Sequence, residues 1–92
     1  MNDKATILVV DDTPELLSFV AGRLRAAGYN VRPADSGELA LVAVAENLPD
    51  LILLDVRMKG MDGLEVCRRL KAAAETRNIP VILMSGFAEV GL

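Results

Sequence analysis

The sequence contains no histidine, which excludes histidine-based zinc sites, catalytic triads that depend on histidine and histidine general bases. Its single cysteine, Cys67, has no partner for an internal disulfide, and its spacing among apolar residues predicts a place in the core. No apolar run approaches the roughly 18 residues that cross a bilayer, and the N-terminus lacks the pattern of a secretory signal. We therefore expect a cytoplasmic protein with no membrane segment, whose chemistry depends on carboxylates.

The sequence also lacks a strong excess of positive or negative charge. The net charge is −3, and the ten basic residues are scattered, so no positive stripe is available to neutralise nucleic-acid phosphates. We expect no direct nucleic acid binding. A length of 92 residues, 52% of them hydrophobic, predicts one soluble domain over residues 1–92 with a small core.

Short apolar runs predict the strands. Ile7–Val10, Leu51–Leu54 and Val81–Met84 are each unbroken, which is typical of strands that are buried on both faces of a parallel sheet. Tyr29–Ala34 is a weaker run, and Pro33 within it favours an edge strand.

Capping signals predict three helices between the strands. They run from Pro14 to a stop at Gly28, from Ser36 to about Asn47 and from Asp62 to about Ala74. Thr13 is the expected N-cap of the first helix, and the spacing of Asp62 to Glu65 fits an acidic capping box at the third. The order βαβαβαβ predicts an α/β doubly wound parallel sheet with helices on both faces.

Four polar residues follow the predicted strands directly. Asp11 and Asp12 follow the first, Asp55 the third and Ser85 the fourth. If the strand order is 2-1-3-4, these side chains meet at one edge of the sheet. Two carboxylates about 5 Å apart repel each other by roughly 3 kcal/mol at an effective dielectric constant near 20. Mg²⁺ best offsets this repulsion, because it prefers carboxylate and phosphate oxygens.

This arrangement suits phosphoryl transfer. A bound Mg²⁺ would neutralise charge on the transferring oxygens, and Asp55 would act as the nucleophile. The hydroxyl of Ser85 would then donate a hydrogen bond to the phosphoryl group, a contact that exists only after phosphorylation and that can work as a switch.

The motifs ILVVDD, LILLDVRMKGMDG and VILMSG, in this order, resemble the strand ends of receiver domains of bacterial two-component response regulators. The resemblance spans nearly the whole chain and implies a flavodoxin-like fold. The roles it implies are direct Mg²⁺ binding by Asp12, binding largely through water by Asp11, ligation and phosphoryl acceptance by Asp55, a backbone carbonyl ligand from Arg57, a switch hydroxyl on Ser85 and a tight turn at Gly63.

The resemblance also implies partners. The phosphoryl donor would be the phosphohistidine of a histidine kinase or a phosphotransfer protein. The domain would be a phosphoacceptor that assists its own phosphorylation and dephosphorylation, and not an enzyme for a separate substrate.

The sequence departs from the family pattern at two places. Lys59 stands where proline is common, and the chain stops at Leu92, before the fifth strand with its phosphate-contacting lysine. We therefore expect a C-terminally incomplete receiver, for which a binding module that no longer switches is the alternative. The edge of Val81–Met84 would then be bare, and we expect a homodimer through it.

Two other α/β classes fit less well. A dehalogenase-type phosphohydrolase needs Asp-x-Asp, but Val56 and Arg57 follow Asp55. A flavodoxin needs a phosphate loop rich in glycine and hydroxyl side chains, where this chain has two aspartates. Two further aspartates have structural interpretations, Asp62 as a helix cap and Asp50 in a solvated turn.

Overall fold

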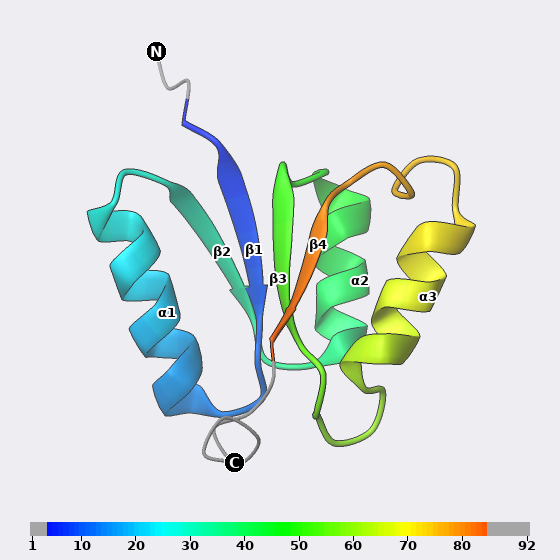
Figure 1. Ribbon diagram of the computed structural model, residues 1–92, viewed down its shortest axis with the longest axis horizontal. Coiled ribbons are helices and arrows are strands. Elements are labelled where there is room, and N and C mark those ends of the chain that lie inside the picture. Colours follow the sequence, from blue (N-terminus) through cyan, green and yellow to red (C-terminus); the bar gives the residue numbers. More distant parts are fainter. Residues whose placement is uncertain (1–3, 85–92) are drawn as a thin grey trace.

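The computed structural model describes residues 4–84 (Figure 1). Its elements are β1 (Thr6–Val10), α1 (Pro14–Ala26), β2 (Asn30–Ala34), α2 (Gly37–Glu46), β3 (Leu51–Asp55), α3 (Gly63–Ala72) and β4 (Val81–Met84). All strand pairs are parallel and the sheet order is β2-β1-β3-β4. The predicted element order and strand order are confirmed. No helix within residues 4–84 is long and apolar enough to span a bilayer.

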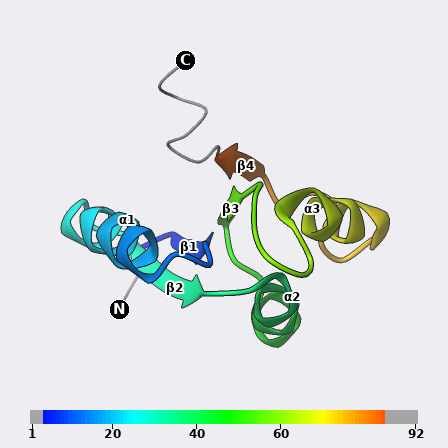
Figure 2. The same ribbon diagram turned by 90° about the horizontal axis from the view of Figure 1, so that it is seen from below.

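The sheet separates two layers of helices. α1 lies on one face and α2 and α3 lie on the other (Figure 2). β1 is central, and its residues Ile7–Val10 are buried. This explains the unbroken apolar run, because alternate residues of a strand point to opposite faces of the sheet and helices cover both faces. Leu8 and Val10 belong to the main core cluster with residues of α2 and α3, whereas Ile7 and Val9 do not.

The main core lies between the sheet and the α2–α3 layer. Ile52 and Leu54 of β3 and Val66 of α3 are among its fully buried members. Cys67 is only partly buried, although it packs against this cluster. The apolar face of α1 is less deeply buried: Leu16, Leu17, Val20 and Leu24 are half-buried, and Ala21 is buried.

The caps explain where the helices begin. The side chain of Ser36 accepts a hydrogen bond from the N–H of Leu39 at 3.1 Å, and that of Asp62 from the N–H of Glu65 at 2.9 Å. Thr13 has the extended backbone of an N-cap, but its side chain makes no capping hydrogen bond. The predicted N-cap position of Thr13 is therefore confirmed, without a capping hydrogen bond to its hydroxyl.

Helix ends agree less closely with the pattern. Gly28 has a φ of 102°, a backbone conformation that favours glycine. The helical conformation of α1 does not continue past this residue, as predicted. α3 ends at Ala72, earlier than the predicted Ala74. Just beyond it, the hydroxyl of Thr76 donates to the carbonyl of Leu70 at 2.6 Å, so a side chain satisfies a carbonyl of the last helical turn.

The two outer strands of the described sheet differ. β2 carries Pro33 at the edge, as predicted. β4 pairs only with β3 in the described residues, and Ile82 and Leu83 are 51% and 42% exposed. The expectation that this run is buried on both faces is therefore wrong for the part of the chain described.

Candidate functional site

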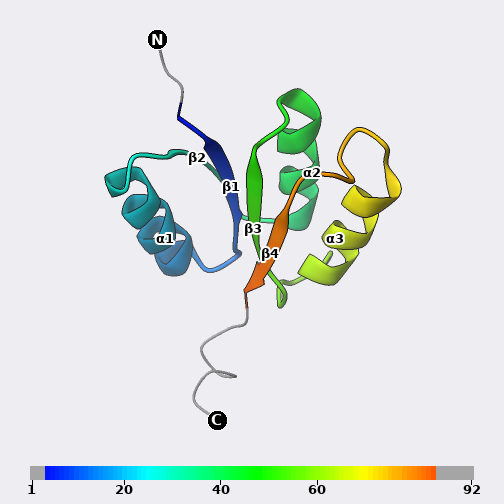
Figure 3. The same ribbon diagram turned by 45° about the horizontal axis from the view of Figure 1, so that its top comes forward.

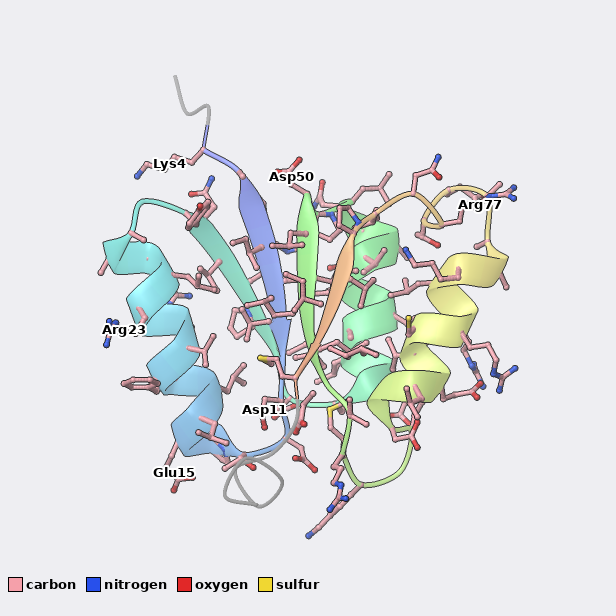
Figure 4. All side chains as sticks on the ribbon, in the orientation of Figure 1. Lys4, Asp11, Glu15, Arg23, Asp50 and Arg77 are labelled. Carbon is pink, nitrogen blue, oxygen red and sulfur yellow. The ribbon has the colours of Figure 1, made fainter. Side chains whose placement is uncertain are left out.

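The carboxyl ends of the strands lie at one end of the molecule, where the β1–α1 and β3–α3 loops leave the sheet (Figure 3). Val10 pairs with Leu54, so Asp11 and Asp55, the next residue of each segment, lie side by side. Asp11 lies at this end of the strands, and Asp50 lies at their opposite end (Figure 4). The topology therefore brings the predicted carboxylates together.

Asp11, Asp12 and Asp55 form what we call the acidic cluster. Each offers a carboxylate oxygen, and the three oxygens lie within 4.8 Å of one another. Asp11 is 5% exposed and Asp55 is 8% exposed, while Asp12 is partly buried. Three acids this close, two of them largely removed from water, repel one another strongly unless a cation or a proton joins them.

Two carboxylates of the cluster are held by backbone groups of their own turns. Oδ1 of Asp11 accepts a hydrogen bond from the N–H of Thr13 at 2.9 Å, and Oδ1 of Asp55 accepts one from the N–H of Arg57 at 3.2 Å. Both are aspartate turns in which the donor lies two residues further on. Each bond fixes one carboxylate oxygen and leaves the second available.

The third carboxylate is held from a distant segment. Oδ2 of Asp12 accepts a hydrogen bond from the backbone N–H of Lys59 at 3.0 Å, across 47 positions of sequence. The side chain of Lys59 is exposed. This backbone contact was not predicted from the sequence, which carries no signal for it beyond the absence of proline at position 59.

The environment of Asp55 disfavours its charge. Burial is the main cause that raises the pKa of the Asp55 carboxyl above its ordinary value, and the charges of Asp11 and Asp12 raise it further. The N–H of Arg57 stabilises the ionised form and partly opposes them. A divalent cation at the cluster would lower this pKa, because it favours the carboxylate.

The β3–α3 loop, residues 56–62, begins directly after Asp55, and a backbone hydrogen bond joins its two ends. The N–H of Gly63 donates to the carbonyl of Val56 at 3.0 Å. A Cβ on Gly63 would overlap the carbonyl of Asp55 and lie 2.9 Å from Cα of Val56, so the chain needs glycine here. Met58 is buried in the core under the loop. The tight turn expected at Gly63 is confirmed.

Some predicted site residues are placed and others are not. Asp11, Asp12 and Asp55 converge as predicted. The backbone of Arg57 lies next to Asp55, although its contact is through the N–H, and ligation by its carbonyl stays a prediction. Ser85 lies outside the described residues.

The family model described as "Response regulator receiver domain" matches residues 7–91. The chain belongs to this family. Receiver domains of this kind act in two-component signalling, and the flavodoxin-like parallel sheet with order 2-1-3-4 agrees with their solved structures. The resemblance inferred from the three strand-end motifs is confirmed.

Among curated relatives of this receiver domain, Response regulator PleD of Caulobacter vibrioides is 49% identical over 81 residues, which cover 88% of this chain and 18% of PleD. The DNA-binding response regulator MtrA of Mycolicibacterium smegmatis is 40% identical, with 86% of this chain and 33% of that protein covered. The chain thus spans about a fifth to a third of the length of these relatives.

Two solved structures have a closely similar fold. The N-terminal domain of a response regulator receiver protein from Methanoculleus marisnigri gives a TM-score of 0.84 at 44% identity, covering 86% of this chain and 64% of that chain. Response regulator TrrA of Thermotoga maritima, solved in complex with Mg(2+)-BeF, gives 0.84 at 32% identity, covering 92% and 72%.

Proposed function

We propose that this receiver domain accepts a phosphoryl group on Asp55 from the phosphohistidine of a histidine kinase or phosphotransfer protein, with Mg²⁺ bound at the acidic cluster. The observation that carries the proposal is the convergence of three carboxylate oxygens within 4.8 Å, with Asp55 at the end of β3. We assign the nucleophile to Asp55, at the end of β3, because it occupies the phosphoacceptor position of the receiver-domain motif LILLDVRMKGMDG.

The donor set fits Mg²⁺. Hard carboxylate oxygens on a partly open surface leave room for water and for phosphate oxygens, which is how Mg²⁺ is usually held. Asp12 and Asp55 would bind the ion directly, Asp11 largely through water, and Arg57 through its backbone carbonyl. The complex of the Thermotoga relative with Mg(2+)-BeF supports a metal site in this fold. When bound, the ion supplies charge neutralisation for the transferring oxygens.

The chain's own groups would position the nucleophile. The N–H of Arg57 holds Oδ1 of Asp55, so Oδ2 is the oxygen left to attack. Attack of Oδ2 on phosphorus forms the O–P bond as the P–N bond of phosphohistidine breaks, and the electron pair stays on the imidazole nitrogen. The hydroxyl of Ser85 would then donate to a phosphoryl oxygen and act as the switch. The domain would assist its own phosphorylation and dephosphorylation and would process no separate substrate.

Treatment with acetyl phosphate and Mg²⁺, followed by intact-mass measurement, tests this function. We expect one added phosphoryl group on the wild type and none on Asp55→Asn. Asp62→Asn is the matched control, because Asp62 caps α3 and lies outside the acidic cluster. Equal labelling of wild type and Asp55→Asn would place the acceptor elsewhere and refute the proposal.

We also propose that the 92-residue chain forms a homodimer through β4. Ile82 and Leu83 present apolar side chains on a strand that pairs only with β3 among the described residues. Edge strands with apolar side chains favour pairing, and a two-fold contact would match each edge with its copy.

A further inference from the structure

The three carboxylates of the acidic cluster each accept one backbone N–H, but they do so in different ways. Asp11 and Asp55 accept from residues two positions further on, so these bonds form wherever the local turn forms. Asp12 accepts from Lys59, in the β3–α3 loop. This third bond therefore exists only when the loop is folded against the end of β1.

Contacts along the β3–α3 loop hold the N–H of Lys59 in place. At its base, the Gly63 N–H bonds the carbonyl of Val56 at 3.0 Å, and in its middle Met58 is buried in the core. At its tip, the N–H of Lys59 meets Oδ2 of Asp12 at 3.0 Å. The side chain of Lys59 is exposed, and the contact with Asp12 is made by the backbone N–H.

We propose that the backbone N–H of Lys59 is a positioning group that holds the carboxylate of Asp12 toward the acidic cluster and thereby sets the affinity for Mg²⁺. The inference rests on the proposed metal site. A carboxylate has about four acceptor positions, so one N–H on Oδ2 leaves Oδ1 fully available. It also removes rotational freedom that the partly buried Asp12 side chain would otherwise lose on binding the ion. Hydrogen-bond partners of metal ligands typically change metal affinity by about 10-fold to 100-fold.

Because the donor is a backbone group, every residue except proline supplies it at position 59. The identity of the side chain should therefore matter little, and the presence of the N–H should matter most. Three variants separate these effects. Lys59→Ala removes the side chain and keeps the N–H, and Lys59→Pro removes both. Replacement of Lys59 by its α-hydroxy acid keeps the side chain and removes the N–H by converting the amide into an ester, which also weakens the carbonyl of Met58 as an acceptor.

The experiment is a Mg²⁺ titration of the 92-residue chain and of each variant. The amide signals of Val56 and Gly63 report binding, and thermal unfolding checks that each chain is folded. We expect wild type and Lys59→Ala to bind with affinities within about twofold of each other, and the ester chain to bind about tenfold more weakly. Lys59→Pro should also be weaker, although its ring restricts the loop. Where the ester and proline chains differ, the ester decides, because it introduces no ring.

The outcomes separate this inference from the proposed function. If the ester chain binds Mg²⁺ as tightly as the wild type, the N–H does not position Asp12 and the inference is overturned while the metal site stands. If Lys59→Ala loses as much affinity as the ester, the side chain is responsible and the inference is also overturned. If the wild type itself shows no response at about 20 mM Mg²⁺, the metal site and the inference both fail.

Discussion

The backbone carbonyl of Asp55 occupies the space that a side chain would take on Gly63. A Cβ built on Gly63 overlaps the Asp55 carbonyl oxygen and lies 2.8 Å from its carbonyl carbon. These obstacles are backbone atoms at the end of β3, and they have no rotamer through which to move aside. The start of α3 and the residue proposed to accept the phosphoryl group are therefore packed directly against each other.

We expect Gly63→Ala to destabilise the fold by about 1–3 kcal/mol, the usual cost of overpacking, and to move the Asp55 backbone. Gly22→Ala is the control, since Gly22 lies within α1 and a Cβ there meets nothing within 4 Å. That substitution should stabilise the chain by about 0.5–1 kcal/mol, because alanine favours helix. Urea unfolding measures both, and equal stabilities of the two variants would contradict the packing argument.

The helix caps make a second matched pair. Asp62→Ala should cost about 1 kcal/mol of stability, because the N–H of Glu65 loses its partner at the start of α3. Thr13→Ala should cost much less, since the Thr13 side chain makes no capping hydrogen bond at α1. Chemical denaturation of both variants decides the point, and a larger loss for Thr13→Ala would be inconsistent with the described caps.

The charge of Asp55 predicts an unusual pH dependence. Its pKa is raised in the folded state, so the folded state holds the proton more tightly than the unfolded state does. Below about pH 3 the carboxyl is protonated in both states and there is no penalty. As pH rises through the folded-state pKa, ionisation of Asp55 destabilises the metal-free fold. We therefore expect Asp55→Asn to be more stable than the wild type at pH 7.

Thermal unfolding at about pH 3 and at pH 7 without metal measures this difference in stability, which should vanish at the lower pH. Asp35→Asn removes the same formal charge at an exposed position outside the cluster and should change little. Adding Mg²⁺ should stabilise the wild type more than Asp55→Asn and so narrow the gap. A wild type that is more stable than Asp55→Asn at pH 7 without metal would show that the cluster carries no repulsion.

The proposed dimer predicts that a charged side chain introduced on β4 will weaken self-association. Sedimentation equilibrium at micromolar concentration should give a dimer for the wild type and a monomer for Ile82→Lys. Leu64→Lys on α3 is the control, because Leu64 is 55% exposed and Ile82 is 51% exposed, so both add a charge to a similarly accessible apolar position. A wild type that remains monomeric at about 100 μM rules out the dimer.

Much of the fold follows from the sequence because its signals are local. The run Ile7–Val10 is continuous because both faces of β1 are covered. Ser36 and Asp62 could be recognised as N-caps because each accepts a hydrogen bond from the N–H three positions further on. The carboxylates could be placed together because parallel strands end at one edge, so topology alone brings Asp11 next to Asp55.

What the sequence did not predict depends on contacts between distant segments. Arg32 lies in β2, yet its guanidinium donates to the carbonyls of Ala43 and Asn47, at 2.7 Å each, around the end of α2. The bond from Lys59 to Asp12 is likewise between backbone and side chain across 47 positions. Neither has a spacing rule, because any residue supplies an N–H or a carbonyl and only the folded geometry selects which.

The central place of β1 has a consequence for the time course of synthesis. β1 is the first of the described strands to be made, but one of its two neighbours, β3, ends about 45 residues later at Asp55. At roughly 5–20 residues per second, a ribosome takes about 2–9 s to cover that interval. Throughout it, Leu8, Val9 and Val10, all fully buried in the finished protein, lack part of their cover. The nascent chain therefore carries an incompletely covered apolar β1 until β3 has been made, and this interval leaves β1 open to capture by chaperones.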